Sequence, residues 1–270
     1  MSHNKNSIDE KTLHTFVASY LSSRPAFYAF IRPQEAYILN QNIQVAQRPI
    51  LDFGCGDGFF ANEAFAEQVV DVGLDVDNSR IHQAKTLKTY QRLNTYEGEE
   101  FPFTSNTFST IFANSVLEHI SNLDNSLDEI FRVLTPGGLF MTSVMADKWE
   151  QYLPIGKLLG KRYLRFLRKK QEHRNLFSHR QWQEVFEKHG FEILSVVGYL
   201  NKRTVNYLEI CHYLSVPSLA SYKLSGRWVP FPNWHKPMHL SKKITSIIKH
   251  DINSPVSESS ALFFIMKKLP

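Results

Sequence analysis

Apolar and polar positions alternate in two different rhythms along the middle of this chain. Short runs of β-branched and aromatic residues are typical of buried strands, and the stretches between them repeat their apolar residues at helical spacing. Strands are predicted over 49–54, 69–76, 93–98, 108–115, 138–145, 191–198 and 260–269. Helices are predicted between them over 58–68, 78–90, 121–134 and 178–190. This alternation predicts βαβ units and an α/β fold with a doubly wound parallel sheet.

Several of these predicted helices carry residues typical of helix starts and stops. Asn78 or Ser79 would cap the second helix, and Ser121 would cap the third. The Pro-Gly-Gly run at 136–138 would end the third helix, and Gly190 would end the fourth. These residues set the predicted limits of the helices.

Three segments fall outside the alternating pattern. Residues 8–47 predict two helices, the second over about 33–45. A basic segment interrupts the alternation after Met145, and a later segment rich in Tyr, Trp, Pro and Lys lacks a regular period. The predicted units are an N-terminal helical cap (1–47), a central core (48–146), a basic helical lid (147–177), a core helix and strand (178–198), an aromatic-rich cap insertion (199–258) and a final core strand (259–270).

The formal net charge of +5 is unevenly distributed. Residues 157–180 contain nine Lys or Arg residues and one acid, Glu172, so this segment carries +8 and the rest of the chain −3. A nucleic-acid-binding protein with a generally basic face is therefore not expected.

The two cysteines, Cys55 and Cys211, are too few for a disulfide framework. No apolar run approaches the roughly 20 residues that span a bilayer, and the first residues are polar, without the apolar centre of a signal peptide. These features lead us to expect a reduced, cytoplasmic protein.

The first predicted strand leads into LDFGCGDG, residues 51–58, in which three glycines occupy alternate positions. A strand, a glycine-rich turn and a helix form a recurring nucleotide-binding device, because glycines let the backbone approach the ligand and the helix start offers N–H groups. Phe59 stands where the dinucleotide fingerprint has its third glycine. Asp75, at the end of the next strand, suits the two hydroxyls of a ribose. The turn therefore predicts a nucleoside ligand.

At these residues the chain resembles the class I S-adenosylmethionine-dependent methyltransferases, and among them the quinone-biosynthesis-like enzymes that modify small molecules. Five stretches match the family's motifs in order: LDFGCGDG (51–58), GLDVD (73–77), YEGEEFPFTSNTFSTIF (96–112), ANSVLEHI (113–120) and RVLTPGGLF (132–140). The resemblance covers residues 30–145 well, and 175–198 and 261–268 more loosely. It implies S-adenosylmethionine as cofactor and a Rossmann-like sheet, mostly parallel with an antiparallel last strand, under a helical cap formed by the N-terminal and inserted segments.

The resemblance also implies a set of cofactor-binding residues. The backbone at Gly54 and Gly56 would lie against the amino-acid head and the ribose, and Asp75 would accept both ribose hydroxyls. Asp52 would orient the turn and reach the amino group, or it would be only a helix or turn cap. The full implied set is Asp52, Gly54, Cys55, Gly56, Asp75, Val76, Glu97, Gly98 and Asn114.

Two members of that set lie in less regular stretches. Glu97, or the backbone N–H of Gly98, would meet the adenine edge, and Asn114 would lie near the methionine. Many relatives have Asp where this chain has Glu97, and Thr110 replaces their usual Asp after Phe108. These departures loosen the third motif and leave the others intact.

His119 is the predicted catalytic base. It follows the fourth strand, near where the methyl group should point, and a neutral imidazole can accept a proton near pH 7. Alternatively, Glu118 and His119 would begin a helix packed on the sheet. Some relatives use this Glu and His as metal ligands with an earlier acid, but Ser115 takes that acid's place here, so no metal is expected. Further acceptor-side candidates are His173, Arg174, His179 and Tyr199.

The stretch after the fourth strand also bears on the methyl acceptor. DNA and protein-glutamine N-methyltransferases of this fold have N-P-P-Y-like residues there, whereas this chain has Asn-Ser-Val-Leu at 114–117. The resemblance therefore favours a small-molecule acceptor, or a lipid- or sugar-linked one, with O-methylation ahead of N- or C-methylation.

Residues 157–170 predict a basic amphipathic helix. Such a helix suits peripheral contact with a membrane or binding of an anionic substrate, or it is a lid with a solvated face. The basic face would hold Lys157, Lys161, Arg165 and Arg168, and the apolar face Ile155, Leu159, Tyr163 and Phe166. The aromatic residues of 199–258 would line the acceptor pocket or pack the cap.

Three functions fit these observations. The first is an S-adenosylmethionine-dependent methyltransferase. The second is a non-catalytic S-adenosylmethionine-binding protein that docks on a membrane or partner through its basic helix. The third is a nicotinamide-dependent dehydrogenase, which Phe59 disfavours.

Overall fold

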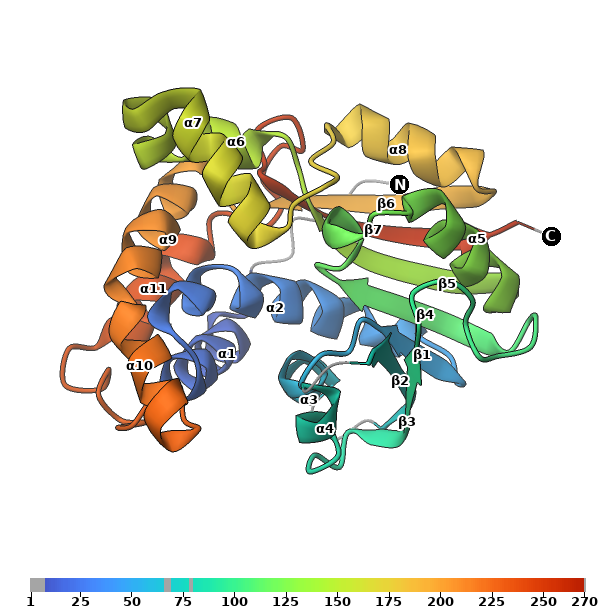
Figure 1. Cartoon of the computed structure of the whole chain (residues 1–270), viewed down its shortest axis with the longest axis horizontal. Coiled ribbons are helices and arrows are strands. Elements are labelled where there is room, and N and C mark those ends of the chain that lie inside the picture. The colour runs from blue at the N-terminus through green and yellow to red at the C-terminus, as the bar shows by residue number, and fades with distance from the viewer. Residues whose placement is uncertain (1–7, 66–68, 78–79, 270) are drawn as a thin grey trace.

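The computed structural model describes residues 8–65, 69–77 and 80–269. Within these ranges, seven strands form one sheet in the order β3-β2-β1-β4-β5-β7-β6 (Figure 1). β7 runs antiparallel to β5 and β6, and the other neighbouring pairs are parallel. The strands are β1 (Ile50–Phe53), β2 (Val70–Val76), β3 (Tyr90–Tyr96), β4 (Phe108–Asn114), β5 (Leu134–Met145), β6 (Phe191–Tyr199) and β7 (Ala261–Lys268). The predicted doubly wound α/β sheet with an antiparallel last strand is confirmed.

Helices cover both faces of the sheet and build a cap at one end of it (Figure 1). The α-helices are α1 (Glu10–Ser23), α2 (Arg32–Asn42), α3 (Phe59–Phe65), α4 (Ile81–Ala84), α5 (Leu123–Val133), α6 (Lys148–Tyr152), α7 (Pro154–Gln171), α8 (His179–Lys188), α9 (Lys202–Leu214), α10 (Val216–Ser225) and α11 (Leu240–Ile248). Three short 3₁₀ helices in the described ranges are η1 (Ala26–Phe30), η2 (Ile43–Val45) and η3 (Leu117–His119).

Two hydrophobic cores lie on opposite faces of the sheet because side chains alternate along each strand. On β1, Ile50 joins the core beneath α1, α2 and the cap, whereas Leu51 joins the core beneath α5 and α8. Phe112 and Ile111 divide in the same way on β4. The cap therefore shares its core with one face of the sheet.

The segment between β2 and β3 differs from the prediction. A helix is predicted over 78–90, but α4 spans Ile81–Ala84 and β3 begins at Tyr90, which pairs with Val70. Pairing with β2 draws this backbone into the sheet before a longer helix can form. The predicted caps Asn78 and Ser79 lie outside the described residues, as do positions 66–68 at the end of the predicted 58–68 helix.

The limits of α5 are also corrected. Its N-cap is Asn122, whose side chain accepts a hydrogen bond from the Asn125 amide, rather than Ser121. The helix ends at Val133, before the Pro-Gly-Gly run, which lies within β5. The register between β4 and β5 shifts in this region, which accommodates the run.

The cap contains more regular structure than its sequence indicates. Residues 199–258, which lack a clear period, form α9, α10 and α11. The predicted basic helix lies in α7, but Gly160 has a non-helical backbone (φ +71°) that kinks it. Leu159 and Phe166, on its predicted apolar face, are exposed. In the part of the chain that the structure describes, no helix is both long enough and apolar enough to cross a bilayer.

Candidate functional site

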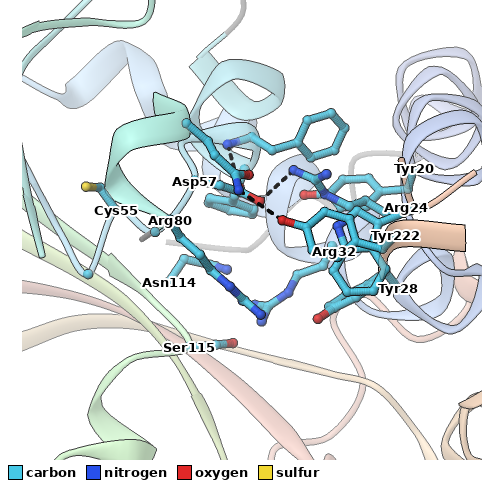
Figure 2. A pocket seen from close by; sticks show the side chains of 16 residues that line it. Tyr20, Arg24, Tyr28, Arg32, Cys55, Asp57, Arg80, Asn114, Ser115 and Tyr222 are labelled. Carbon is cyan, nitrogen blue, oxygen red and sulfur yellow. Dashed lines mark hydrogen bonds and ion pairs between the residues drawn. The ribbon is translucent and has the colours of Figure 1, made fainter. Parts of the chain in front are cut away.

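A cavity of about 210 Å³ opens at the carboxyl ends of β1 and β4, between the sheet and the cap (Figure 2). Four of the predicted cofactor residues line it: Gly54, Cys55, Gly56 and Asn114. Ligands of open α/β sheets bind at this edge, where neighbouring connections leave to opposite sides. The position of the cavity therefore matches the predicted nucleoside site.

Two glycines of the turn after β1 have different roles. Gly54 (φ +76°) lies so close to Val116 that an added Cβ would meet a methyl carbon at 2.3 Å. Gly56 (φ +55°) would direct a Cβ into space where no described atom lies within 4 Å. Gly54 therefore permits close packing of the protein, and Gly56 leaves the backbone exposed toward the cavity.

Asp75 holds this turn from the end of β2. Its carboxylate accepts hydrogen bonds from the backbone amides of Gly56 (2.6 Å) and Val76 (2.7 Å). Burial raises the pKa of Asp75, and these two hydrogen bonds oppose the rise. Because each carboxylate oxygen can accept more than one hydrogen bond, the side chain can brace the turn and also accept from a ligand.

Asp52 lies deeper, inside β1. The Tyr90 hydroxyl donates to its carboxylate at 2.5 Å and so joins β1 to the start of β3. Burial raises the pKa of Asp52 to about 8, the nearby Asp75 charge adds to the rise, and the Tyr90 hydrogen bond opposes it. Asp52 is not among the residues that line the cavity, so direct contact with the cofactor remains a prediction.

Three other predicted residues lie at the edge of the site. Val76 is exposed at the end of β2, and Glu97 and Gly98 follow β3 at the surface. The residues that line the cavity do not include them. Their predicted contacts with the ribose and adenine remain predictions.

The N-terminal helices supply site residues that sequence reasoning missed. Tyr20, Arg24 and Arg32 face the glycine turn across the cavity (Figure 2). The Tyr20 hydroxyl is buried and has no hydrogen-bond partner among the residues described. Arg24 pairs with Asp57 at 2.8 Å, and its guanidinium lies 4.1 Å from the centre of the Phe59 ring. An orphaned hydroxyl beside two guanidinium groups suits a ligand that carries a carboxylate.

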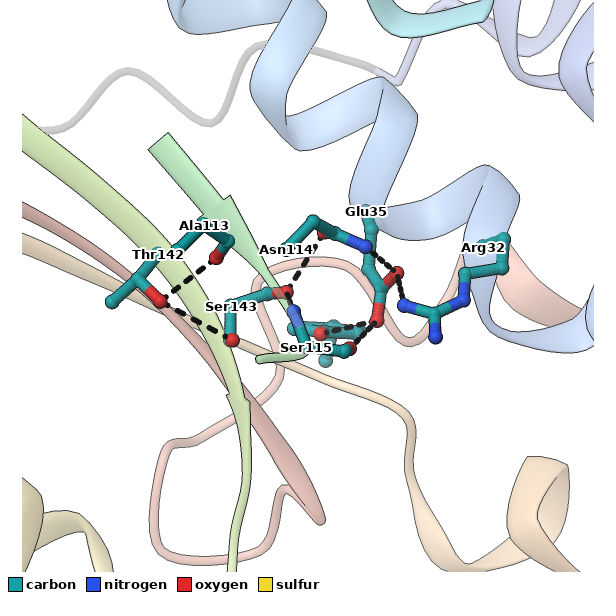
Figure 3. Close-up of polar contacts among 8 residues, drawn as sticks. Arg32, Glu35, Ala113, Asn114, Ser115, Thr142 and Ser143 are labelled. Carbon is teal, nitrogen blue, oxygen red and sulfur yellow. Dashed lines mark hydrogen bonds and ion pairs between the residues drawn. The ribbon is translucent and has the colours of Figure 1, made fainter. Parts of the chain in front are cut away.

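Glu35 of α2, also missed from the sequence, is fully buried and is the centre of a hydrogen-bond network (Figure 3). Its carboxylate accepts hydrogen bonds from Arg32 (2.7 Å), Asn114 (2.8 Å), Ser115 (3.1 Å) and Tyr199 (2.9 Å). Two of these donors follow or end β4 and one ends β6, so a single carboxylate fixes the N-terminal cap against the sheet. The residues next to Glu35 in the sequence do not indicate this role, because three of its four partners lie 79 or more positions away.

A second cavity, of about 250 Å³, adjoins the first and shares Tyr28, Arg32 and Ser115 with it. We call this second cavity the chamber. Its wall includes His119 and residues of η1, α6 and α9. The cap therefore forms part of the wall of a second cavity directly beside the first.

His119 and His173 lie together in the chamber, with ring centres 5.1 Å apart. Burial lowers the pKa of both imidazoles, that of His173 to about 3, with a further contribution from the neighbouring His119. Both rings are therefore neutral near pH 7. A neutral ring nitrogen at the wall of the chamber is able to accept a proton from a bound ligand.

Glu118 also lines the chamber and is fully buried. Neither carboxyl oxygen has a hydrogen-bond partner among the described groups. Burial raises the pKa of Glu118 to about 8. At neutral pH this group is therefore mainly a carboxylic acid, which can both donate and accept a hydrogen bond.

The remaining acceptor-side candidates lie elsewhere. Arg174 is exposed, and its backbone amide donates to the Glu118 carbonyl at 2.7 Å. His179 stacks on Phe264 at the start of α8, and Tyr199 is buried with its hydroxyl on Glu35. The structure thus brings His173 into the chamber with His119 but not these three.

A hydrogen bond joins the cap to another helix at the first cavity. Gln83 of α4 donates to the Tyr222 hydroxyl of α10 at 3.0 Å. Tyr222 also stacks on Trp228, with ring centres 4.2 Å apart, and all three residues line the cavity. The cap therefore also contacts α4, through a hydrogen bond at the wall of this cavity.

Comparison with known proteins identifies the family. A family model described as a methyltransferase domain matches residues 18–196. The chain belongs to this family. It is a class I S-adenosylmethionine-dependent methyltransferase domain, as the resemblance implied, and the dehydrogenase alternative is set aside.

Two curated relatives share parts of this methyltransferase sequence. The malonyl-[acyl-carrier protein] O-methyltransferase of Legionella pneumophila is 31% identical over 117 residues, which are 41% of this chain and 41% of the relative. This chain thus spans about two fifths of that relative's length. The ubiquinone biosynthesis O-methyltransferase of Coxiella burnetii is 24% identical over 201 residues, 71% of this chain and 84% of the relative.

A solved structure shares the fold over nearly the whole methyltransferase. It is a protein from Thermotoga maritima described as an S-adenosylmethionine-dependent methyltransferase and possible histamine N-methyltransferase. The TM-score is 0.59 at 15% sequence identity, with 97% of this chain and 98% of the other covered. The likeness at this identity shows the fold.

The residues of the first cavity fit S-adenosylmethionine, the donor of this family. Gly56 leaves backbone open toward the cavity, and Asp75 lies next to it for the ribose. The unpartnered Tyr20 hydroxyl and the guanidinium groups of Arg24 and Arg32 suit the amino-acid head. The first cavity is the candidate donor site, and the chamber is the candidate acceptor site.

Proposed function

We propose that this protein methylates an oxygen atom of a small molecule, or of a lipid- or sugar-linked one, that binds in the chamber. The observation that carries the proposal is the place of His119: it lines a chamber that shares three residues with the candidate donor site. Two relatives are named as O-methyltransferases, which supports oxygen as the acceptor atom.

The chain's own residues would position the acceptor and remove its proton. Bound S-adenosylmethionine supplies an electrophilic methyl group, so catalysis depends mainly on placing the acceptor in line. Tyr28 and Trp149 offer aromatic walls, and the Glu118 carboxylic acid offers a hydrogen bond to a polar substituent. Neutral His119 would take the hydroxyl proton as the oxygen attacks.

The test is transfer of labelled methyl groups to metabolite and lipid extracts. We expect His119→Ala to reduce transfer by about 10²–10⁴-fold, the usual contribution of a general base, while calorimetry shows unchanged binding of S-adenosylmethionine. His82→Ala is the matched control, because His82 is exposed on α4, outside the chamber. No transfer to any fraction would favour the non-catalytic alternative, and unchanged transfer by His119→Ala would remove His119 as the base.

The pH profile adds a second readout. Because burial lowers the pKa of His119, the imidazole stays neutral to a lower pH than an ordinary histidine. We expect kcat/KM to fall with decreasing pH below about 6.5, and His119→Ala to lack that limb. An acid limb that persists in His119→Ala would assign the proton acceptor to another group.

A further inference from the structure

The cap end of the molecule exposes an unusual number of large apolar side chains. Among the described residues, 13 of the 18 large hydrophobic side chains that are strongly exposed lie in α7, α9, α10 or the segment 231–238. Leu158 is 82% exposed, Leu224 88% and Phe231 74%. Scattered single apolar residues are normal on a protein surface, but a concentration in one region marks an interaction site.

The same end of the molecule is strongly basic. Residues 154–171 and 199–249 contain 15 Lys or Arg residues and one acid, so these segments carry +14 and the other 201 residues −9. The one acid, Glu209, is buried and accepts hydrogen bonds from the Tyr163 hydroxyl and the Ile155 amide. Arg168 and Lys249 pair with acids of other segments. Most of this positive charge is therefore not neutralised locally.

The exposed apolar residues follow the geometry of the helices. On α9, Ile210 and Leu214 are one helical turn apart and face outward, whereas Val205 and Leu208 on the same helix are buried. Leu214 also lines a groove of about 230 Å³ with Phe231 and other aromatic side chains. The helix is thus apolar on two faces. One face packs against the hydrophobic core, and the other is exposed.

These elements adjoin one another at the end of the molecule away from the sheet. Figure 1 shows α7, α9 and α10 along that end. The hydroxyl of Tyr163 on α7 hydrogen-bonds to that of Tyr213 on α9 at 2.5 Å, and α10 follows α9 directly. We call the exposed side chains of α7, α9, α10 and 231–238 the docking face.

We propose that the docking face binds the surface of an anionic phospholipid bilayer. Lys and Arg side chains gain about 1 kcal/mol each near such a surface, and apolar side chains gain by entering the headgroup region. A second copy of this chain would bring two faces of like charge together. A nucleic acid would satisfy the charge but would offer little to aliphatic residues such as Leu158 and Leu224.

Docking would place the chamber close to the lipid. The outer side of α9 presents Ile210 and Leu214 to the bilayer, while Leu208 and His212 on its inner side line the chamber. An acceptor anchored in the membrane would then be separated from the chamber by the thickness of one helix. This last consequence rests on the proposed function, whereas docking itself does not.

The test is co-sedimentation of the full chain with vesicles, without acceptor or turnover. We expect binding to vesicles of equal parts phosphatidylglycerol and phosphatidylcholine, weakening as salt rises, and little binding to pure phosphatidylcholine. Leu214→Ser and Phe231→Ser should each weaken partitioning about tenfold, and the combined variant K161E/R165E/K169E by more than tenfold.

Matched controls lie outside the docking face. Leu194→Ser replaces an exposed leucine of β6, and K85E/K88E reverses two exposed lysines near α4. Both should bind vesicles as the unaltered chain does, and calorimetry should show equal S-adenosylmethionine binding in all variants.

Several outcomes would overturn the proposal. They are equal binding to neutral and anionic vesicles, equal losses in the control variants, binding to duplex DNA or RNA but not to vesicles, and a dimer that Leu214→Ser dissociates. Because no acceptor is used, failure of docking leaves the proposed methyl transfer to be judged by its own test.

Discussion

The sheet and the cap build their binding sites in different ways. The candidate donor site at the sheet edge is built largely from backbone and short connections: Gly56 faces the cavity, Asp75 accepts a hydrogen bond from the Gly56 amide, and Asn114 ends β4. The chamber is built from side chains of helices that are distant in sequence. A cofactor common to a whole family can be bound by the backbone geometry that the fold provides. The choice of acceptor would instead depend on the side chains of the cap helices, which can vary without changing the fold.

We expect the largest effect at Glu35, which joins the cap to the sheet. Glu35→Ala would leave the half-buried donors Arg32, Asn114 and Ser115 and the buried donor Tyr199 without the carboxylate that accepts from them. Removing one partner of a buried, paired charge costs about 3–5 kcal/mol. We expect a loss of that size in the free energy of unfolding, measured by urea denaturation, together with weaker cofactor binding.

Two further variants sharpen the Glu35 result. Glu35→Gln keeps an oxygen acceptor and should lose less stability than Glu35→Ala. Glu187→Ala, on the exposed face of α8, should change stability by no more than about 0.5 kcal/mol. A Glu35→Ala protein as stable as Glu187→Ala would show that the two halves are not joined through this carboxylate.

The second prediction concerns the sheet half alone. Asp75→Ala removes a charged acceptor, so we expect S-adenosylmethionine binding to weaken by about 1.5–3 kcal/mol in calorimetry. The control is Asp77→Ala, two residues further along and exposed. Vesicle binding should be unchanged in both, because neither residue belongs to the docking face. An unchanged affinity for the cofactor would exclude Asp75 from the donor site.

The third prediction concerns Asp52, which lies beneath the candidate donor site. Its pKa is raised to about 8 from the ordinary 3.8, so between these values the folded state holds a proton that the unfolded state releases. Stability therefore falls as pH rises through this window. Asp52→Asn removes the titration and still accepts from Tyr90. We therefore expect the stability of Asp52→Asn, relative to that of the unaltered chain, to increase as pH rises from about 5 to about 8.

Thermal unfolding of the cofactor-free proteins from about pH 5 to about pH 8 measures this difference. The Tm of Asp52→Asn should vary less with pH than that of the unaltered chain. Parallel pH profiles would mean that Asp52 is ionised in the folded protein.

The difference between the sheet and the cap also explains which features the sequence predicts well. The glycine turn, Asp75 and the strand pattern are local features, because glycine spacing and apolar periodicity act over a few residues. His119 is placed in a cavity beside the donor site because it directly follows β4 in the chain. The predicted 78–90 helix is too long because pairing of Tyr90 with Val70 outweighs local helical preference.

Other site residues depend on contacts that no local pattern contains. Glu35 meets Asn114 across 79 positions and Tyr199 across 164. Tyr20 fits the apolar face of α1, so nothing in its neighbourhood separates a core tyrosine from one whose hydroxyl borders the donor site. The exposed apolar side of α9 is equally hidden, since only the fold decides which face is covered.

The contact between Gln83 and Tyr222 has a consequence for how the protein cycles. It joins two residues that line the candidate donor site, one from α4 and one from the cap helix α10. We expect spent cofactor that leaves past this contact to require the hydrogen bond to break, so α10 would move away from α4 in each round. Anything that holds α10 in place, a lipid surface included, would then govern how fast that movement occurs.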